Sequence, residues 1–396
     1  MILWIIALCL MGISGWIGLH TGGIRAAFAF LGLIMATLLA RALSGLVSPL
    51  FALAGLKHPL LLAFVAPLTV FLIVLLIFKM SGEAVHRKVD AYYKYKATDR
   101  DRSNFERLNH SLGLCLALAN GAFFFFVLAA LIYVFGYFTV QVGRAEDDSK
   151  ALRVVNALSD SLDKSGLRKA IAPLAPASTN YYDAADIAGD IFHNPLLQTR
   201  LASYPAFLGL AEKPEFRSLG DDVRFQQFWM EGHSFNDLIA HPKMAPLIHN
   251  PELYTEVMGL VKGDLKDFKN YLETGVSAKY DDEKILGRWT ANYKESVAQT
   301  HKSKPNLSPE EARRNRVALM KAGNATLTAM IDNRVLLKMP LKSADSQKAQ
   351  GTWKDTGGGT YLLTFEEKGR KLELQAAVEP KRLLLSQDGY TLVFEK

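Results

Sequence analysis

Four histidines are the residues of this sequence that most readily suggest chemistry, because imidazole is the commonest metal ligand in proteins. His193, His241 and His249 come directly before a Pro or an Asn-Pro pair, and His233 lies between them in the chain. Pro favours the first position of a helix, so three of these histidines stand where short helices are expected to begin. Side chains there serve the local fold, and we expect no metal site among them.

Other patterns that could support catalysis are weak. We find no Ser, His and Asp set and no pair of carboxylates that indicates hydrolytic chemistry. The glycines at residues 357–359 lack the Lys and Ser or Thr of a nucleotide-binding loop. The two cysteines, Cys9 and Cys115, lie in apolar stretches and cannot form a disulfide framework or a zinc site. We therefore expect a protein that is not an enzyme, with no catalytic residues, no cofactor and no metal.

The elements that would have to position any site begin with four apolar stretches. They cover residues 2–19, 24–40, 59–78 and 112–138. Each has close to the ~20 residues with which a helix crosses ~30 Å of hydrocarbon, and none has the polar face of a surface helix. Averages over all 396 residues, 49% hydrophobic and 21% charged, hide this segregation. We predict four transmembrane helices in contact with the lipid bilayer.

A basic stretch joins the third and fourth apolar stretches and sets the expected topology. Residues 79–107 contain eight Lys and Arg side chains, and we interpret them as a loop. Such loops stay on the cytoplasmic side, because moving their charges across the membrane is unfavourable. The positive excess behind the net charge of +7 lies beside membrane segments, so we expect no nucleic acid partner. Alternation of the helices then places everything after about residue 141 outside the cytoplasm.

Two short motifs carry a family resemblance. Residues 20–25 read His-Thr-Gly-Gly-Ile-Arg and enter the second apolar stretch, while residues 107–113 read Arg-Leu-Asn-His-Ser-Leu-Gly and open the fourth. This pattern resembles the colicin V production protein (CvpA) family over about residues 1–140. The resemblance implies a multi-pass protein of the bacterial inner (plasma) membrane that supports secretion or envelope maintenance. The candidate functional residues are Gly22, Gly23, Arg25, Asn109, Gly113 and Asn120.

Two of these candidates have alternative interpretations. Arg25 either extends its charged end to the cytoplasmic headgroups or contacts a substrate, lipid or partner. Asn120 stands where the family usually has a basic residue, which puts any role of that charge in doubt. Its side chain either forms an interhelical hydrogen bond or binds a solute.

Small residues in the first and last apolar stretches predict close helix packing. They recur every four positions at Gly113, Ala117 and Gly121 in the last stretch. They recur every three positions at Gly12, Gly15 and Gly18 in the first. Small side chains let the backbones of membrane helices approach one another.

The middle of the chain is expected to be helical. Residues 149–175 predict an amphipathic helix or a pair of helices, which Pro173 and Pro176 end. Farther on, apolar residues recur nine or ten positions apart, at Leu197, Phe207, Phe216, Phe225, Phe235, Met244 and Leu253. Pro stands two residues before five of them, at Pro195, Pro205, Pro214, Pro242 and Pro251. Because Pro is favoured at the first helical position, each unit predicts a short helix.

This repeat is similar to the Pro-initiated helical repeats of co-chaperones that include ubiquilins, over about residues 185–258. The resemblance implies a groove for apolar segments of client proteins. The alternative is that the repeated apolar side chains pack neighbouring units together and the region is a spacer.

From residue 281 onward the sequence predicts an antiparallel β meander. Strands are expected at residues 285–293, 325–331, 334–339, 351–354, 360–366, 371–378, 382–386 and 390–394, with turns that include residues 368–369 and 388–389. One helix, opened by the capping box of residues 308–311, is expected to interrupt the strands.

Two Gly-x-Trp sequences in this region, at residues 287–289 and 351–353, resemble the signature of lipocalin-like small barrels. A small barrel either holds an apolar ligand or is filled by its own side chains. We favour the filled barrel, because its interior is expected to accommodate Trp289, Trp353, Phe365, Leu374 and Leu384.

The sequence therefore predicts a multidomain fold. It comprises an α-helical membrane bundle (residues 1–140), an all-α array of short helices (141–280) and an antiparallel β-barrel or meander with one helix (281–396). The expected partners are the lipid bilayer, proteins in the membrane or periplasm, and an apolar peptide or lipid. A membrane transporter is an alternative, although the apolar stretches hold almost none of the paired ionisable residues that it would need. A ligand-sensing membrane protein is a further alternative.

Overall fold

A computed structural model describes residues 2–144, 147–174, 177–339, 347–367, 370–387 and 390–396. The chain forms two compact units. The first comprises residues 1–189 and 231–256, and the second comprises residues 190–230 and 257–396. The three-domain division made from the sequence stays a prediction.

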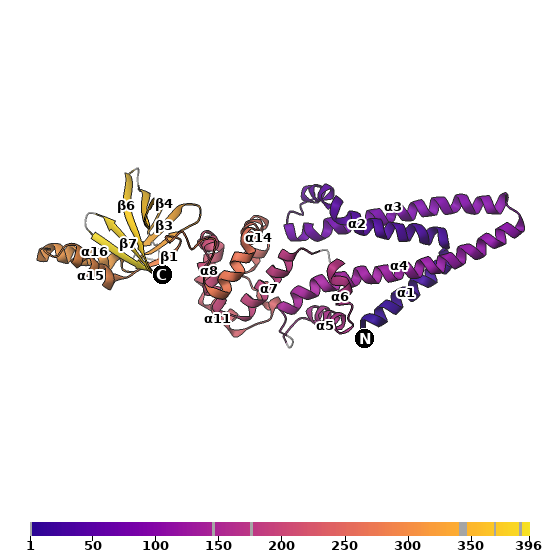
Figure 1. Cartoon of the computed structure of the whole chain (residues 1–396), viewed down its shortest axis with the longest axis horizontal. Helices are drawn as coiled ribbons and strands as arrows, with labels where there is room; N and C mark the ends of the chain where they lie inside the picture. Colours follow the sequence, from indigo (N-terminus) through magenta and orange to yellow (C-terminus); the bar gives the residue numbers. More distant parts are fainter. Residues whose placement is uncertain (1, 145–146, 175–176, 340–346, 368–369, 388–389) are drawn as a thin grey trace. The chain divides into compact units, whose positions relative to one another are not determined.

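Four long apolar helices dominate the first unit. They are α1 (Ile2–Thr21), α2 (Gly23–Leu53), α3 (Pro59–Tyr95) and α4 (Asp99–Gln141). All four are long and apolar enough to cross a membrane, which confirms the predicted number. Helix α2 packs along α3 and also contacts α4, while α1 packs along α4 (Figure 1). Large side chains such as Leu8, Leu38 and Leu72 remain exposed on these helices, as contact with lipid requires.

The basic stretch between the third and fourth apolar stretches is helical, so the prediction of a loop was wrong. Helix α3 continues to Tyr95 and α4 begins at Asp99, at a shared tip (Figure 1). No Pro interrupts residues 79–107, and the hydroxyl of Thr98 caps α4 by accepting the N–H of Asp101. The rings of Tyr93 and Phe105 stack 4.2 Å apart and join the two extensions. The basic side chains therefore project from a helical hairpin.

Shorter helices complete the first unit. They are α5 (Lys150–Lys164), α6 (Arg168–Ile171), η1 (Ala172–Leu174), most of α7 (Thr179–His193), α12 (Phe235–Ala240), α13 (Ala245–Ile248) and the start of α14 (Pro251–Thr274). Helices α5 and α6 supply the helical region predicted for residues 149–175, and the predicted stop at Pro176 lies outside the described residues. Leu162 and Ile171 enter one buried cluster with Leu3 and Phe125 from the membrane helices.

The array of short helices predicted for the middle of the chain is confirmed. In the second unit it comprises α8 (Leu196–Ser203), η2 (Pro205–Phe207), α9 (Leu208–Ala211), α10 (Pro214–Gly220) and all but the last residue of α11 (Val223–Glu231). Pro205, Pro214 and Pro251 each occupy the first position of a helix, as expected. The expectation was wrong at two prolines: Pro195 precedes α8, which begins at Leu196, and Pro242 is followed by a turn, so that α13 begins only at Ala245.

A closed barrel of eight antiparallel strands forms the C-terminal part, which confirms the predicted β fold. Its strands are β1 (Gly287–Ala291), β2 (Thr326–Ala329), β3 (Arg334–Met339), β4 (Gln347–Gly357), β5 (Thr360–Glu367), β6 (Arg370–Glu379), β7 (Arg382–Gln387) and β8 (Tyr390–Glu395). Each strand pairs with the next in sequence, and β8 returns to pair with β1. The predicted turns at residues 368–369 and 388–389 lie outside the described residues.

Two helices, not one, separate β1 from β2. Helix α16 (Pro309–Ala322) has the predicted capping box at Ser308. Helix α15 (Tyr293–Ser303) was missed, because its start was assigned to the end of the first strand. The side chain of Asn292 accepts the N–H of Glu295 and begins α15, so β1 ends two residues earlier than expected. The Ser296 hydroxyl of α15 accepts the N–H of Val393 in β8, at a distance of 2.9 Å.

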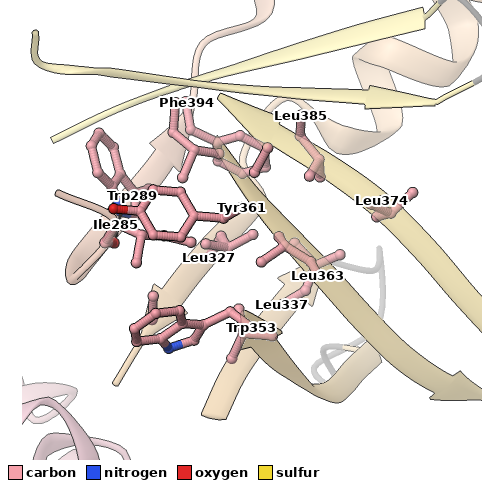
Figure 2. Close-up of a cluster of buried hydrophobic side chains, with 14 of the residues drawn as sticks. Ile285, Trp289, Leu327, Leu337, Trp353, Tyr361, Leu363, Leu374, Leu385 and Phe394 are labelled. Carbon is pink, nitrogen blue, oxygen red and sulfur yellow. Dashed lines mark hydrogen bonds between the residues drawn. The ribbon is translucent and has the colours of Figure 1, made fainter. Parts of the chain in front are cut away.

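Large apolar side chains occupy the barrel interior (Figure 2). Both tryptophans donate their indole N–H to backbone oxygens, Trp289 to Ile285 at 2.7 Å and Trp353 to Met330 at 2.9 Å. Of the five residues expected inside, Trp289, Trp353, Phe365 and Leu374 belong to this core. Leu384 does not, because Leu383 and Leu385 point inward. Three consecutive leucines offer no alternation that would fix which face of the strand is buried.

Candidate functional site

The turn between α1 and α2 is the centre of the candidate site. Gly22 caps the N-terminus of α2 with a φ angle of +82°, a conformation that L side chains rarely adopt. A Cβ atom at Gly22 would collide with the side-chain amide of Asn109 in α4. A Cβ atom at Gly23 would lie 2.8 Å from Cβ of Leu112. The two glycines are therefore required by the close approach of this turn to α4.

Asn109 and Gly113 are the residues of α4 that contact the turn between α1 and α2. The Oδ1 atom of Asn109 accepts the N–H of Ile24 at 3.3 Å, and so satisfies one of the N–H groups that the start of α2 leaves without an intrahelical partner. A Cβ atom at Gly113 would collide with the carbonyl oxygen of Gly18 and lie 3.0 Å from the carbonyl carbon of Gly22. These residues fix the distance between α4 and the turn.

The predicted small-residue faces largely meet one another. A Cβ atom at Gly18 would collide with Ala117, and one at Gly121 would lie 2.8 Å from Cα of Met11. Gly15 lies against Leu118, with 3.1 Å from its added Cβ position to the nearest side-chain atom. Gly12 does not take part, since an added Cβ atom there meets no described atom within 4 Å. The expectation for Gly12 was wrong because a spacing of three drifts around a helix of about 3.6 residues per turn, so that only Gly15 and Gly18 stay on the contact face.

Arg25 forms an ion pair that sequence analysis missed. Its Nε atom lies 2.6 Å from Oε2 of Glu83 in α3, and its Nη2 atom donates to Oε1 of Glu83 at 3.0 Å. Arg87 also donates to Oε1 of Glu83, at 3.1 Å. The Arg25 and Glu83 side chains are 33% and 37% exposed, which puts the pair at the edge of the packed helices. The sequence contained one indication of this pair: Glu83 is the first acidic residue of the chain, and so the first possible carboxylate partner for Arg25.

Asn120 links α4 to α2 inside the helix bundle. Its Nδ2 atom donates to the carbonyl oxygen of Ala26 at 3.2 Å, and the residue is buried. Its Oδ1 atom accepts no hydrogen bond from the described residues. Since the carbonyl group of Ala26 belongs to the first turns of α2, Asn120 extends the contact that Asn109 begins at Ile24.

The structure thus brings the six candidates around one element, the start of α2. We call Gly22, Gly23, Arg25, Asn109, Gly113 and Asn120, with Glu83, the α2 entry site. This site holds the turn between α1 and α2 close to α4 and contains one partly exposed ion pair, Arg25 with Glu83. Its residues do not include a nucleophile beside a base. Across the residues that the structure describes, no group of three or more His, Cys, Asp and Glu side chains could hold a metal ion.

The architecture defines a class of protein: a four-helix membrane domain followed by short helices and a closed β-barrel. The family model of the colicin V production protein matches residues 4–160. The match includes the whole α2 entry site and confirms the predicted type of the N-terminal domain. It continues past residue 140 into α5. No curated protein and no solved structure matches the chain.

Proposed function

We propose that this is a multi-pass protein of the bacterial inner membrane that supports secretion or envelope maintenance by binding protein partners or an apolar ligand, and that it catalyses no reaction. The match of residues 4–160 to the colicin V production protein carries this proposal. The α2 entry site supports it, because a turn held by glycines and one ion pair suits a stable docking scaffold better than reaction chemistry.

The proposed orientation places the tip of α3 and α4 in the cytoplasm and residues after about 141 in the periplasm. The basic side chains of residues 79–107 support it. A reporter that is active only in the periplasm should function when fused after Lys396 and fail when inserted between Tyr95 and Asp99. The reverse result would overturn the orientation.

Cross-linking in the native membrane followed by purification tests the proposed role. Specific secretion or envelope proteins should be recovered with the wild-type chain. An Arg25→Ala variant should lose a partner that docks at the α2 entry site. Arg102→Ala, which breaks the exposed pair with Glu106 in α4, should keep that partner. Recovery of the same proteins with both variants and with an unrelated membrane protein would contradict the proposal.

A transporter is the second candidate, and the pairing of Arg25 with Glu83 favours it. Ionisable pairs at membrane helices mark many substrate and proton pathways. Flux of protons or of a small solute into proteoliposomes should then depend on the pair, and Glu83→Gln should abolish it. Equal flux in liposomes with wild type, Glu83→Gln or no protein would exclude this function.

A further inference from the structure

A cavity of about 520 Å³ lies within the second compact unit. Its lining residues come from α8, η2, α9, α10 and α14 and from β1, β2 and β3. Pockets of about 300–1,000 Å³ hold small-molecule ligands in proteins, so the volume is sufficient for a ligand. The cavity is separate from the barrel interior, which its own core side chains occupy.

The floor of the cavity is apolar. Phe207 and Leu210 are buried there, and Leu201, Phe216 and Val257 are half-buried around them. Phe207 and Phe216 are two of the residues that recur in the helical repeat. An apolar ligand would remove the exposed part of these side chains from water, which the hydrophobic effect favours.

Three cations stand at the same cavity: Arg217 of α10, Arg288 of β1 and Lys338 of β3. Among the described lining residues Asp221 is the only carboxylate, and it is 76% exposed and lies 3.9 Å from Arg217. Behind the wall, Glu212 pairs with both Lys338 and Arg288, the latter at 2.6 Å. Three cations therefore face two carboxylates, and one positive charge is left over.

Burial makes this surplus charge costly. The side chain of Lys338 is only 13% exposed, and its burial lowers the pKa of the ammonium group even though Glu212 lies beside it. Arg217 and Arg288 lower that pKa further by repulsion. An anionic group placed at the cavity would reduce this repulsion and receive charge-assisted hydrogen bonds.

We propose that this cavity binds an amphipathic anion, with a single apolar chain against Phe207 and Phe216 and a carboxylate or phosphate head group at Arg217, Arg288 and Lys338. This proposal specifies the chemical class of the apolar ligand in the proposed function, and it rests on that function. A free fatty acid and a lysophospholipid with a phosphate monoester share this chemistry, and the test below separates them.

The experiment uses the full chain in phosphatidylcholine nanodiscs and a palmitate that carries a photoreactive diazirine. Illumination should label peptides that contain the cavity walls, as read by mass spectrometry. Unlabelled palmitate or palmitoyl lysophosphatidic acid should compete, and the better competitor identifies the head group. Hexadecanol, which has the same chain without the charge, should compete about tenfold less well or worse, since a hydrogen bond to a charged group is lost.

Two pairs of variants test the location. Ala202→Trp fills the cavity from an exposed wall position and should remove the labelling, whereas Thr199→Trp, exposed on the same helix but outside the wall, should keep it. Arg217→Gln should weaken the binding of palmitate by about tenfold. Arg224→Gln, at an exposed residue outside the wall, should leave palmitate binding unchanged. Unchanged melting temperatures show that the variants are folded.

Several results would overturn the proposal: no labelling of the wild type, equal labelling after Ala202→Trp, or equal competition by hexadecanol and palmitate. Displacement of the label by an apolar helical peptide, but by neither anion, would overturn it in favour of a client groove. Because the cross-linked membrane partners are measured separately, failure here leaves the proposed membrane role standing.

Discussion

The α2 entry site and the cavity of the second unit are built in opposite ways. In the α2 entry site, glycines let backbones meet, and Arg25 with Glu83 adds one charged pair at the edge. In the cavity, large side chains form the walls and one buried carboxylate, Glu212, holds two cations. A close backbone contact can be recognised in the sequence by a Gly within a short motif. A buried charge cluster joins residues far apart in the chain and has no such local motif. The first region was therefore found from the sequence and the second was not.

The largest effect is expected at Glu212, because its removal leaves Lys338 and Arg288 without their buried partner. Breaking a buried ion pair from one side costs about 3–5 kcal/mol, so Glu212→Ala should strongly destabilise the second unit. The measurement is the melting temperature of the full chain in detergent. Glu310→Ala is the control, since its pair with Arg314 is 79% and 75% exposed and should matter little.

A double variant sharpens this prediction. Glu212→Met combined with Lys338→Met replaces both buried charges with apolar groups. This double variant should regain much of the stability that Glu212→Ala loses. A double variant no more stable than Glu212→Ala would show that Glu212 acts through packing alone, and the contrast with the α2 entry site would fail.

A second large effect is expected where α1 meets α4. Gly113→Val places side-chain atoms against the carbonyl oxygen of Gly18, and overpacking of this kind costs about 1–3 kcal/mol. The melting temperature in detergent should fall. Gly12→Val is the matched control, because an added Cβ atom there meets no described atom within 4 Å. Equal effects of the two substitutions would show that close backbone approach does not hold this site together.

Much of the architecture could be predicted from the spacing of apolar residues, because this spacing is visible among neighbouring residues of the chain. The four membrane helices and the eight strands were recognised from apolar runs and alternation. The helical tip of α3 and α4 was missed because its charges were interpreted as a loop, although pairs four residues apart such as Arg87 with Glu83 stabilise a helix. The pairing of Arg25 with Glu83 and the walls of the cavity join residues far apart in the chain, and no local pattern predicts them.

A smaller effect is expected from acid. Burial alone would raise the pKa of Glu212, but hydrogen bonds from Lys338 and Arg288 outweigh it and hold the pKa below its ordinary value. The unfolded chain then binds the proton more tightly than the folded chain. This stability is present above the ordinary carboxyl pKa of about 4.3 and is lost as the pH falls through the lower folded value.

The measurement is the melting temperature as a function of pH. Glu212→Gln removes the titrating group, so its melting temperature should fall less steeply in acid than that of the wild type. Glu310→Gln, at an exposed pair, should keep the wild-type slope. A Glu212→Gln profile parallel to the wild type would show that the buried cluster does not contribute to acid sensitivity.

The smallest effect on stability is expected at the charged pair of the α2 entry site. Glu83→Gln should lower the stability by only about 0–1 kcal/mol, because both side chains are about one-third exposed. Glu106→Gln is the control, as Glu106 pairs with Arg102 farther along the same hairpin. A structural role for Arg25 predicts the same small change in both variants and the same cross-linked partners. A functional role predicts that Glu83→Gln alone loses partners or flux while its melting temperature falls no more than that of Glu106→Gln, since the surrounding glycine contacts hold the fold without the pair.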